Sequence, residues 1–393
     1  MFPMLGILYV GAACRQAGAE VLLWDMNYSA DPPVEECDIL MVTANTPTWP
    51  TACEVATRIR AGLKVVGGPH PTATGERGPF DLGCKGPGER AAMWAVSYML
   101  GNPMSPTAPA PEVWPAYDLW PELGQVSACA VEGEEPEPGC SIITSRGCPY
   151  ACNFCASEVM WHRRVRFREV EDVLAEAKYL HGSFGIRQLS IKDDVANLKK
   201  PRFAELCRGF SDLGMKWRMH TRTDHVSLDE FRMMKDCGCV EVGFGVESGS
   251  QRMLNLMGKA NTVENNERAI VWANEVGLRP RIYLIVGFPG ETWESVHQTL
   301  DFVRRTRPHR ALVNNFVPYP GCPVWNNPAA FGCTIDKSNL ETYWQVGLEE
   351  DEGFQAAFDS MTREELREAR RVLQEACEQL TGSPDRRKEA ALV

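Results

Sequence analysis

The feature that most constrains the fold is a regular alternation of short β-rich runs and longer helical runs after residue 140. Such alternation is typical of parallel βαβ units. Six repeats over about 180 residues predict a partial (β/α)6 barrel, because a closed eight-stranded barrel usually needs about 250 residues. We expect strands at residues 141–144, 188–191, 216–221, 241–246, 281–286 and 311–317, separated by helices at 170–181, 202–213, 228–236, 263–276 and 295–306.

Three cysteines stand within eight residues just after the first of these strands. Cys148, Cys152 and Cys155 have the spacing C-x3-C-x2-C. Consecutive loop positions point in different directions, so three thiols this close together indicate convergence on one inorganic centre. A structural zinc ion normally has a fourth ligand at matching spacing, and no second C-x2-C or H-x3-H pair follows. The pattern therefore favours a four-iron cluster with one iron open to a small molecule, and structural zinc is the alternative.

Composition narrows the class of protein. A 44% apolar and 24% charged chain is typical of globular proteins, and the net charge of -11 argues against a general nucleic-acid or membrane surface. The longest apolar stretch, residues 5–14, is shorter than the roughly 18 residues of a membrane span, and no export signal accompanies it. Most of the 15 cysteines are therefore expected to be reduced, buried thiols. We expect a cytoplasmic, soluble protein without nucleic-acid or membrane partners.

The cysteine motif, with the aromatic Phe154 directly before its last cysteine, resembles the signature of radical S-adenosylmethionine (radical SAM) enzymes. The segments GFGVESGS, GFPGET and PYPG, and the pair Arg166 and Arg168, make residues 140–325 similar to the branch that carries a vitamin B12 domain before the barrel. The resemblance implies a [4Fe-4S] cluster on the three cysteines. Its open iron would chelate S-adenosylmethionine, and one-electron reduction would yield a 5'-deoxyadenosyl radical.

Polar residues at the strand ends are candidates for binding that cofactor. Asp193 and Asp194 resemble the site for the methionyl ammonium, with a charge pair at a helix N-terminus as the alternative. Arg222 is a candidate for the methionyl carboxylate, with a surface ion pair as the alternative. Glu247 and Ser248 resemble the ribose- and carboxylate-binding strand end of the family, with a helix cap as the alternative. The residues that carry out the chemistry on the substrate stay unknown.

Residues 1–100 predict a separate α/β unit that resembles the flavodoxin-like B12 domain, with four strands near residues 20, 39, 64 and 82. Gly67, Gly68 and His70, in the segment GGPHPTATGE, resemble its corrin-facing loop. The D-x-H-x-x-G motif that supplies a lower histidine ligand to cobalt is absent. If cobalamin binds, we therefore expect cobalt without a histidine from the usual position, and turn packing is the alternative role of His70.

The first strand of a flavodoxin-like sheet is missing from this unit, because the sequence opens at the first helix. In the strand order 2-1-3-4-5 that strand is an interior one, and its loss exposes two rows of unpaired backbone groups. Either the true start lies upstream, or another segment completes the sheet, or the domain is degenerate.

The chain after residue 325 carries no cofactor motif. Residues 101–139, rich in proline and acid, predict a linker, and residues 140–330 form the predicted barrel. Residues 331–393 predict a helical cap whose main helix starts with a capping box from Thr362 to Glu365 and whose last residues fray.

Three functions are compatible with these patterns. The first is a radical SAM enzyme that uses cobalamin to methylate an unactivated carbon of a small molecule or peptide, with a flavodoxin or ferredoxin as one-electron donor. The second keeps the radical chemistry without methyl transfer and gives cyclisation, oxidation or rearrangement. The third is a non-catalytic iron–sulfur electron-transfer module, which does not need a six-unit barrel.

Overall fold

The computed structural model describes residues 5–26, 29, 31–105, 112–120, 123, 137–343 and 354–381. The chain forms two compact units, Met1–Ala128 and Cys129–Val393. Most of the predicted linker lies outside the described residues. Within the described part, no helix combines the length and the apolar character that a bilayer crossing requires.

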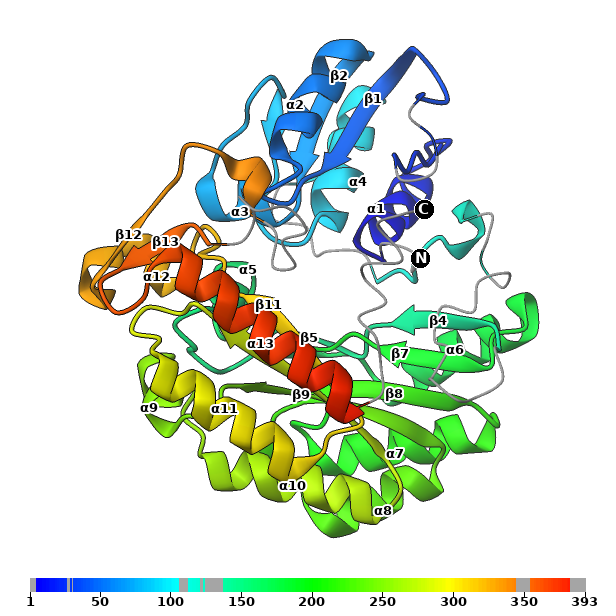
Figure 1. Ribbon diagram of the computed structural model, residues 1–393. Coiled ribbons are helices and arrows are strands. Elements are labelled where there is room, and N and C mark those ends of the chain that lie inside the picture. The colour runs from blue at the N-terminus through cyan, green and yellow to red at the C-terminus, as the bar shows by residue number, and fades with distance from the viewer. Residues whose placement is uncertain are drawn as a thin grey trace. The chain divides into compact units, whose positions relative to one another are not determined.

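The first unit contains a parallel sheet of three strands in the order β1-β2-β3 (Figure 1). Helices α1 and α4 lie against each other beside it. Leu63 and Val65 of β2 pack with Ala95 of α4, so one face of this sheet is covered by α4. The elements are α1 (Leu5–Gln16), β1 (Glu36–Thr43), α2 (Trp49–Arg58), β2 (Arg60–Gly67), α3 (Pro69–Thr74), β3 (Leu82–Gly83), α4 (Glu89–Met99) and the 3-10 turn η1 (Tyr117–Leu119).

The prediction of a strand at residues 20–25 is wrong, because this segment joins no sheet among the described residues. In the order 2-1-3-4-5 the second strand pairs only with the first, and β1 here corresponds to the third. Without the first strand, residues 20–25 therefore have no neighbour to pair with. Val21 still packs near Ile39 of β1, but Leu22 is 60% exposed.

The second unit is built on a parallel sheet of six strands in the order β11-β10-β9-β8-β7-β4. Each strand lies beside its neighbour in the chain, as βαβ units dictate. The predicted α/β fold with parallel sheets is confirmed. The strands are β4 (Gly139–Ile142), β7 (Gln188–Ile191), β8 (Lys216–Thr221), β9 (Cys239–Glu247), β10 (Arg279–Val286) and β11 (Arg310–Asn315), and β5 (Ser145–Arg146) pairs separately with β6 (Arg166–Phe167).

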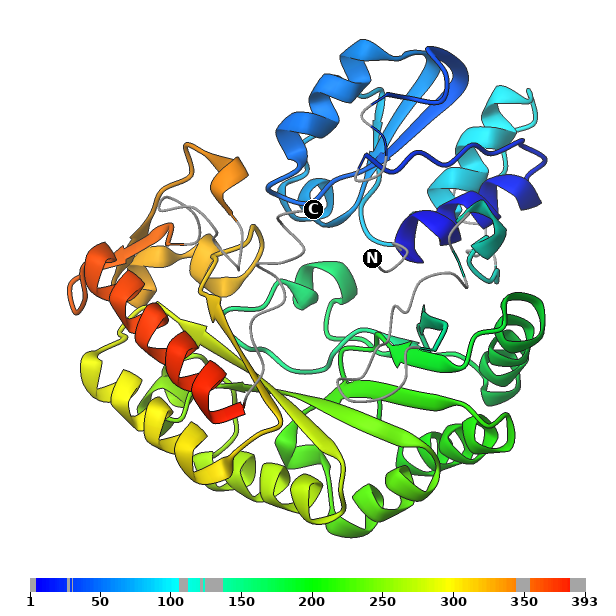
Figure 2. The same ribbon diagram turned by 45° about the vertical axis from the view of Figure 1, so that its right-hand side comes forward.

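Helices cover one face of this sheet, and the short helix α5 lies on the other side (Figure 2). Trp217 of β8 points to the helices, with its ring 6.0 Å from that of Phe203 and 6.2 Å from that of Phe210. Strand alternation therefore turns Arg218 and His220 to the opposite face, on the side of α5. The helices are α5 (Ser157–Trp161), α6 (Val170–Phe184), α7 (Lys200–Asp212), α8 (Leu228–Asp236), α9 (Gln251–Leu256), α10 (Val263–Glu275) and α11 (Trp293–Thr306), with the turn η2 (Thr223–His225).

The last described residues form a small antiparallel pair and one long helix. The predicted capping box is confirmed: the Glu365 backbone donates to Thr362 Oγ1 (3.2 Å), and the Thr362 backbone donates to Glu365 Oε2 (2.8 Å). The helix lies against β11 and α11 (Figure 1). The predicted frayed tail lies outside the described residues. These elements are α12 (Pro323–Asn326), η3 (Pro328–Phe331), β12 (Cys333–Ile335), η4 (Leu340–Thr342), β13 (Ala356–Phe358) and α13 (Arg363–Thr381).

Candidate active site

The three cysteines of the motif lie on the loop between β5 and α5, half-buried and without disulfide bonds. The three thiols lie close enough to interact electrostatically. A negative charge on Cys152 raises the pKa of both Cys148 and Cys155. Within the described ranges, no three His, Cys, Asp or Glu side chains form a ready-made site for a single metal ion. Three soft thiolate donors in electrostatic contact on one loop fit an iron–sulfur cluster.

Backbone contacts fix the shape of this loop. Gly147 has φ +100°, and a Cβ there would collide with the carbonyl oxygen of Arg164, so only glycine fits directly before Cys148. Further along, the Asn153 backbone donates to the carbonyl of Met257 (2.8 Å). The Asn153 side chain donates to the carbonyl of Leu256 (2.8 Å), which ties the loop to the end of α9.

Two cations lie beside the cysteines. Burial raises the pKa of the Cys155 thiol to about 12. Burial also raises the pKa of Cys152, but the charges of Lys259 and Arg222 oppose that rise. A cluster binds thiolates and not thiols. Arg222 and Lys259 therefore supply positive charge where the ligands must lose protons.

Arg222 forms the ion pair that was the alternative to cofactor binding, with Asp224 as its partner, but it is only 4% exposed, so the pair is buried on the arginine side. Its guanidinium lies 3.9 Å from the ring centre of Tyr150, inside the cysteine motif. Nε and Nη2 donate to the Asp224 carboxylate (2.9 and 2.8 Å), and Nη2 also donates to the carbonyl of Lys259 (2.9 Å). Arg222 thus braces the cluster loop, and its predicted contact with the methionyl carboxylate remains a prediction.

The neighbouring aspartates differ in environment. Asp193 is 2% exposed and accepts from Thr144 N (2.7 Å), Thr144 Oγ1 (2.7 Å) and Ser145 Oγ (2.5 Å). Its oxygens are therefore used to fix the end of β4. Asp194 is exposed and accepts from Ser157 Oγ at 3.5 Å. Of the two, Asp194 has the oxygens better placed for a ligand, and the ammonium-binding role of both remains a prediction.

Glu247 ends β9 in a buried ion pair. Its carboxylate accepts from Lys259 Nζ at 2.7 Å, and both side chains are less than a tenth exposed. Its backbone is left-handed (φ +66°), which is strained for a residue other than glycine and is typical of functional positions. Gly245 makes room, because a Cβ there would collide with Glu247 Oε1 and come within 2.9 Å of Lys259 Nζ. Sequence reasoning missed Lys259, which lies in a loop after α9 without any motif of its own.

The other two predicted residues of this region serve packing. Ser248 is 2% exposed, and its hydroxyl bonds Thr299 Oγ1 (3.1 Å), which anchors the end of β9 to α11. Phe154 packs on an apolar cluster that includes Phe288 and Cys333. The ammonium of Lys259 lies 5.7 Å from the Phe154 ring centre. A direct contact of Ser248 or Phe154 with a cofactor remains a prediction.

In the first unit, the predicted corrin-facing residues lie at the end of β2 and in α3. Gly68 has φ +100°, and a Cβ there would come within 2.8 Å of the Ala44 carbonyl oxygen. Gly67, directly before it, ends β2. His70 is 1% exposed, with its ring 4.7 Å from that of Trp49 and Nε2 3.5 Å from Glu76 Oε2. Packing thus explains Gly68 and His70, and their contact with a corrin remains a prediction.

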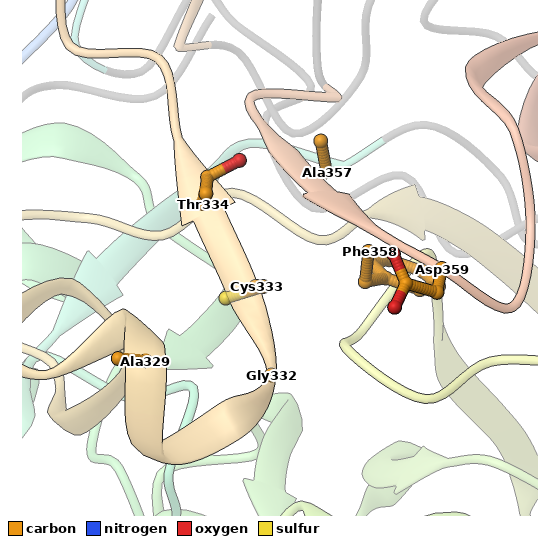
Figure 3. A pocket seen from close by; sticks show the side chains of 7 residues that line it. All are labelled: Ala329, Gly332, Cys333, Thr334, Ala357, Phe358 and Asp359. Atoms are coloured by element: carbon orange, nitrogen blue, oxygen red, sulfur yellow. The ribbon is translucent and has the colours of Figure 1, made fainter.

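A hollow of about 320 Å³ lies beside the antiparallel pair β12 and β13 (Figure 3). It contains none of the residues predicted from the sequence, and its only ionisable groups are Asp359 and the buried thiol Cys333. Its full lining is Ala329, Gly332, Cys333, Thr334, Ala357, Phe358 and Asp359. The candidate site is therefore the cysteine loop and the strand ends, not this hollow.

A parallel βα sheet with a cysteine-bearing loop after its first strand defines a class of enzyme. Residues 142–303 match the radical SAM superfamily, so this chain carries a radical SAM domain. Enzymes of that superfamily use a [4Fe-4S] cluster and S-adenosylmethionine, which confirms these two predicted cofactors.

Similar proteins of known name include methyltransferases. An uncharacterised methyltransferase of Pyrococcus horikoshii is 29% identical over 82% of this chain and 78% of its own length. Bacteriochlorophyllide d C-12(1)-methyltransferase of Chlorobaculum tepidum is 24% identical over 78% of this chain and 69% of its own. The radical SAM methyltransferase TsrM of Kitasatospora setae, solved with cobalamin and a [4Fe-4S] cluster, has a similar fold, with a TM-score of 0.69, 19% identity and coverage of 88% of this chain and 80% of TsrM.

Proposed function

We propose that this protein is a cobalamin-dependent radical SAM methyltransferase that adds a methyl group to an unactivated carbon of a small molecule or peptide. The observation that carries the proposal is the meeting of three thiols with the buried Glu247–Lys259 pair at the carboxyl end of the sheet. Carboxyl ends of parallel strands are where such barrels bind their ligands. When bound, the cluster supplies the electron that splits a sulfur–carbon bond of S-adenosylmethionine, and cobalamin supplies the methyl group.

The residues of the chain then have three tasks. Cys148, Cys152 and Cys155 would hold the cluster as thiolates, and the cluster would supply the iron that binds the cofactor. Arg222 and Lys259 balance the negative charge of these thiolates, because both lower the pKa of Cys152. Glu247 faces the same region and offers a carboxylate to hydroxyl or ammonium groups of S-adenosylmethionine.

Two observations support cobalamin binding: the parallel sheet with flanking helices in the first unit, and the similar fold of TsrM, which was solved with cobalamin. His70 is enclosed by Trp49 and paired with Glu76, so we propose that cobalt binds without a histidine ligand from this unit. We further propose a cytoplasmic location, where thiols stay reduced and a flavodoxin or ferredoxin can supply the electron.

A second candidate is radical SAM cyclisation, oxidation or rearrangement without methyl transfer. The observation in its favour is the three-stranded sheet of the first unit, which is smaller than the five-stranded flavodoxin-like sheet expected for B12.

Anaerobic reconstitution of the whole chain with iron, sulfide and hydroxocobalamin tests both candidates. We expect about four irons per chain, formation of 5'-deoxyadenosine from S-adenosylmethionine under reduction, and cobalamin that stays with the protein through gel filtration. Cys148→Ala should lose the iron, and the matched variant Cys237→Ala, at the end of α8, should keep it.

The outcomes separate the candidates. Iron and 5'-deoxyadenosine with retained cobalamin support the methyltransferase. The same products with cobalamin lost on the column favour the second candidate. A full cluster that never yields 5'-deoxyadenosine contradicts both.

A further inference from the structure

The face of the six-stranded sheet on the side of α5 is polar, whereas the face covered by the other helices is apolar. On β8, Trp217 and Met219 lie under the helices and are each 1% exposed, while Arg218 and His220 alternate with them. On β10, Ile282 and Leu284 are fully buried, while Arg281 and Tyr283 alternate with them. A sheet face that only filled a core would carry apolar side chains. This one carries groups that bind polar ligands.

One layer of this face is an ion network of Arg218, Glu241 and Arg281. The Glu241 carboxylate accepts from Arg281 Nη2 at 2.7 Å and lies 3.4 Å from Arg218 Nη1. Arg218 Nε donates to Ser190 Oγ at 3.1 Å. Both arginines are thus engaged with the protein, so they act on a ligand through their charge. Arg218 and Arg281 carry two positive charges and Glu241 one negative charge, so this layer has a net positive charge.

The next layer toward the carboxyl ends of the strands is the pair His220 and Tyr283. His220 Nε2 lies 2.9 Å from Tyr283 Oη, although β9 runs between their strands. The pair meets because β9 carries glycine there: a Cβ on Gly243 would lie 2.6 Å from His220 Cδ2 and 3.2 Å from Tyr283 Cε2. Both residues are partly exposed.

Three positive charges act on His220 of this pair. Burial, together with the charges of Lys192, Arg218 and Arg281, lowers the pKa of His220 to about 3. A hydrogen bond between the His220 ring and the Ile191 backbone brings the ring beside Lys192, whose side chain is exposed at the end of β7. A cationic ligand would be repelled here, and an anion would be attracted.

We propose that the substrate carries an acidic group, a carboxylate or a phosphate, that binds beside Lys192 on the face formed by His220 and Tyr283. This inference rests on the proposed function, because it takes this face to be where the substrate lies during radical chemistry. Lys192 is the residue that meets the acid directly. Arg218 and Arg281 attract the acid through their positive charges. His220 and Tyr283, which meet over Gly243, form the polar surface on which it binds.

The test measures binding of four probes with the same phenylalkyl body to the reconstituted chain by isothermal titration calorimetry, with S-adenosylmethionine present. The probes are 3-phenylpropionate, 2-phenylethyl phosphate, 3-phenylpropionamide and 3-phenylpropylamine. We expect the two acids to bind in the millimolar range or tighter, at least about tenfold more tightly than the amide and the amine. The acid that binds more tightly shows whether the acidic group of the substrate is a carboxylate or a phosphate.

Two variants complete the design. Lys192→Met should abolish the preference for acids, while Lys178→Met, at an exposed position on α6, should leave it unchanged. Iron content and the affinity for S-adenosylmethionine should be the same in both variants.

Equal binding of all four probes overturns the inference, as does absent binding of the acids. A Lys192→Met variant that instead loses affinity for S-adenosylmethionine also overturns it, because Lys192 would then serve the cofactor. A wild-type chain without a cluster or without 5'-deoxyadenosine formation counts against the proposed function instead, so the two failures are distinct.

Discussion

The Lys259 ammonium and the Glu247 carboxylate are joined at 2.7 Å in a place where both are less than a tenth exposed. Burying two charges is costly unless they are paired. Each side chain therefore needs the other as its partner and holds it in place. The carbonyl of Lys259 also accepts from Arg222, which stacks on Tyr150 inside the cysteine motif. The end of β9 and the cluster loop are therefore one connected structure.

Gly245→Ala should disturb this ion pair, because the added methyl group would collide with Glu247 Oε1 and come within 2.9 Å of Lys259 Nζ. We expect 5'-deoxyadenosine formation to fall about tenfold or more, with iron content retained. Gly182→Ala is the matched control, because a Cβ at that position on α6 meets no atom within 4 Å. A Gly245→Ala enzyme as active as the control would show that the pair has no part in the reaction.

Asp193→Asn should weaken the attachment of the cluster loop. An amide cannot accept all three hydrogen bonds that the Asp193 carboxylate takes from Thr144 and Ser145. We expect a loss of about 1–3 kcal/mol in the free energy of unfolding and less than full iron incorporation. Thermal denaturation and iron analysis measure both, with Asp212→Asn at an exposed position as control. Normal iron loading in the Asp193→Asn variant would contradict the anchoring role.

Glu291 should make the stability depend on pH. Burial raises the pKa of this carboxyl, which is 3% exposed, to about 7 in the folded protein, so folding favours the protonated form. The stabilisation is complete below the unfolded-state pKa near 4.5 and is lost as pH rises through about 7.

The comparison of wild type with Glu291→Gln isolates this effect. Between pH 4.5 and 7 the wild type should lose about 1–3 kcal/mol relative to the variant. Glu294→Gln, exposed in the first turn of α11, should follow the wild type. Parallel curves for wild type and Glu291→Gln from denaturant titrations across this range would refute the shifted pKa.

His70 should not ligate cobalt. Its ring packs against Trp49, and its nitrogens lie 3.4 Å from Thr46 Oγ1 and 3.5 Å from Glu76 Oε2. The electron paramagnetic resonance spectrum of bound cob(II)alamin should therefore be the same with unlabelled and nitrogen-15 histidine. Hyperfine splitting that changes with the isotope, and disappears in His70→Ala, would assign the ligand to His70.

The sequence predicted the second unit well, because its strands and helices follow hydrophobic periods that tertiary contacts reinforce. The predicted strands at 188–191 and 216–221 and the helix at 228–236 coincide with β7, β8 and α8. The strand predicted at 20–25 failed because its local pattern is strand-like, whereas a strand also needs a neighbour to pair with.

Side-chain roles were harder to predict, because they depend on contacts between distant segments. Asp193 bonds residues about fifty positions earlier, and Lys259 meets Glu247 only after α9 has turned the loop back. Gly243 and Gly245 occupy alternate positions of β9. This pattern could have indicated that side chains from elsewhere meet over that strand. Such glycines leave space for neighbours instead of filling it.

The central claim is that the three cysteines hold a cluster whose fourth iron binds S-adenosylmethionine. Electron–nuclear double resonance on the reduced, reconstituted chain tests it most directly, with S-adenosylmethionine carrying nitrogen-15 in its methionyl amino group. The account predicts a nitrogen-15 coupling to the cluster that is present in wild type and absent in Cys152→Ala. A fully assembled cluster whose spectrum shows no such coupling, and does not change when S-adenosylmethionine is added, would contradict it.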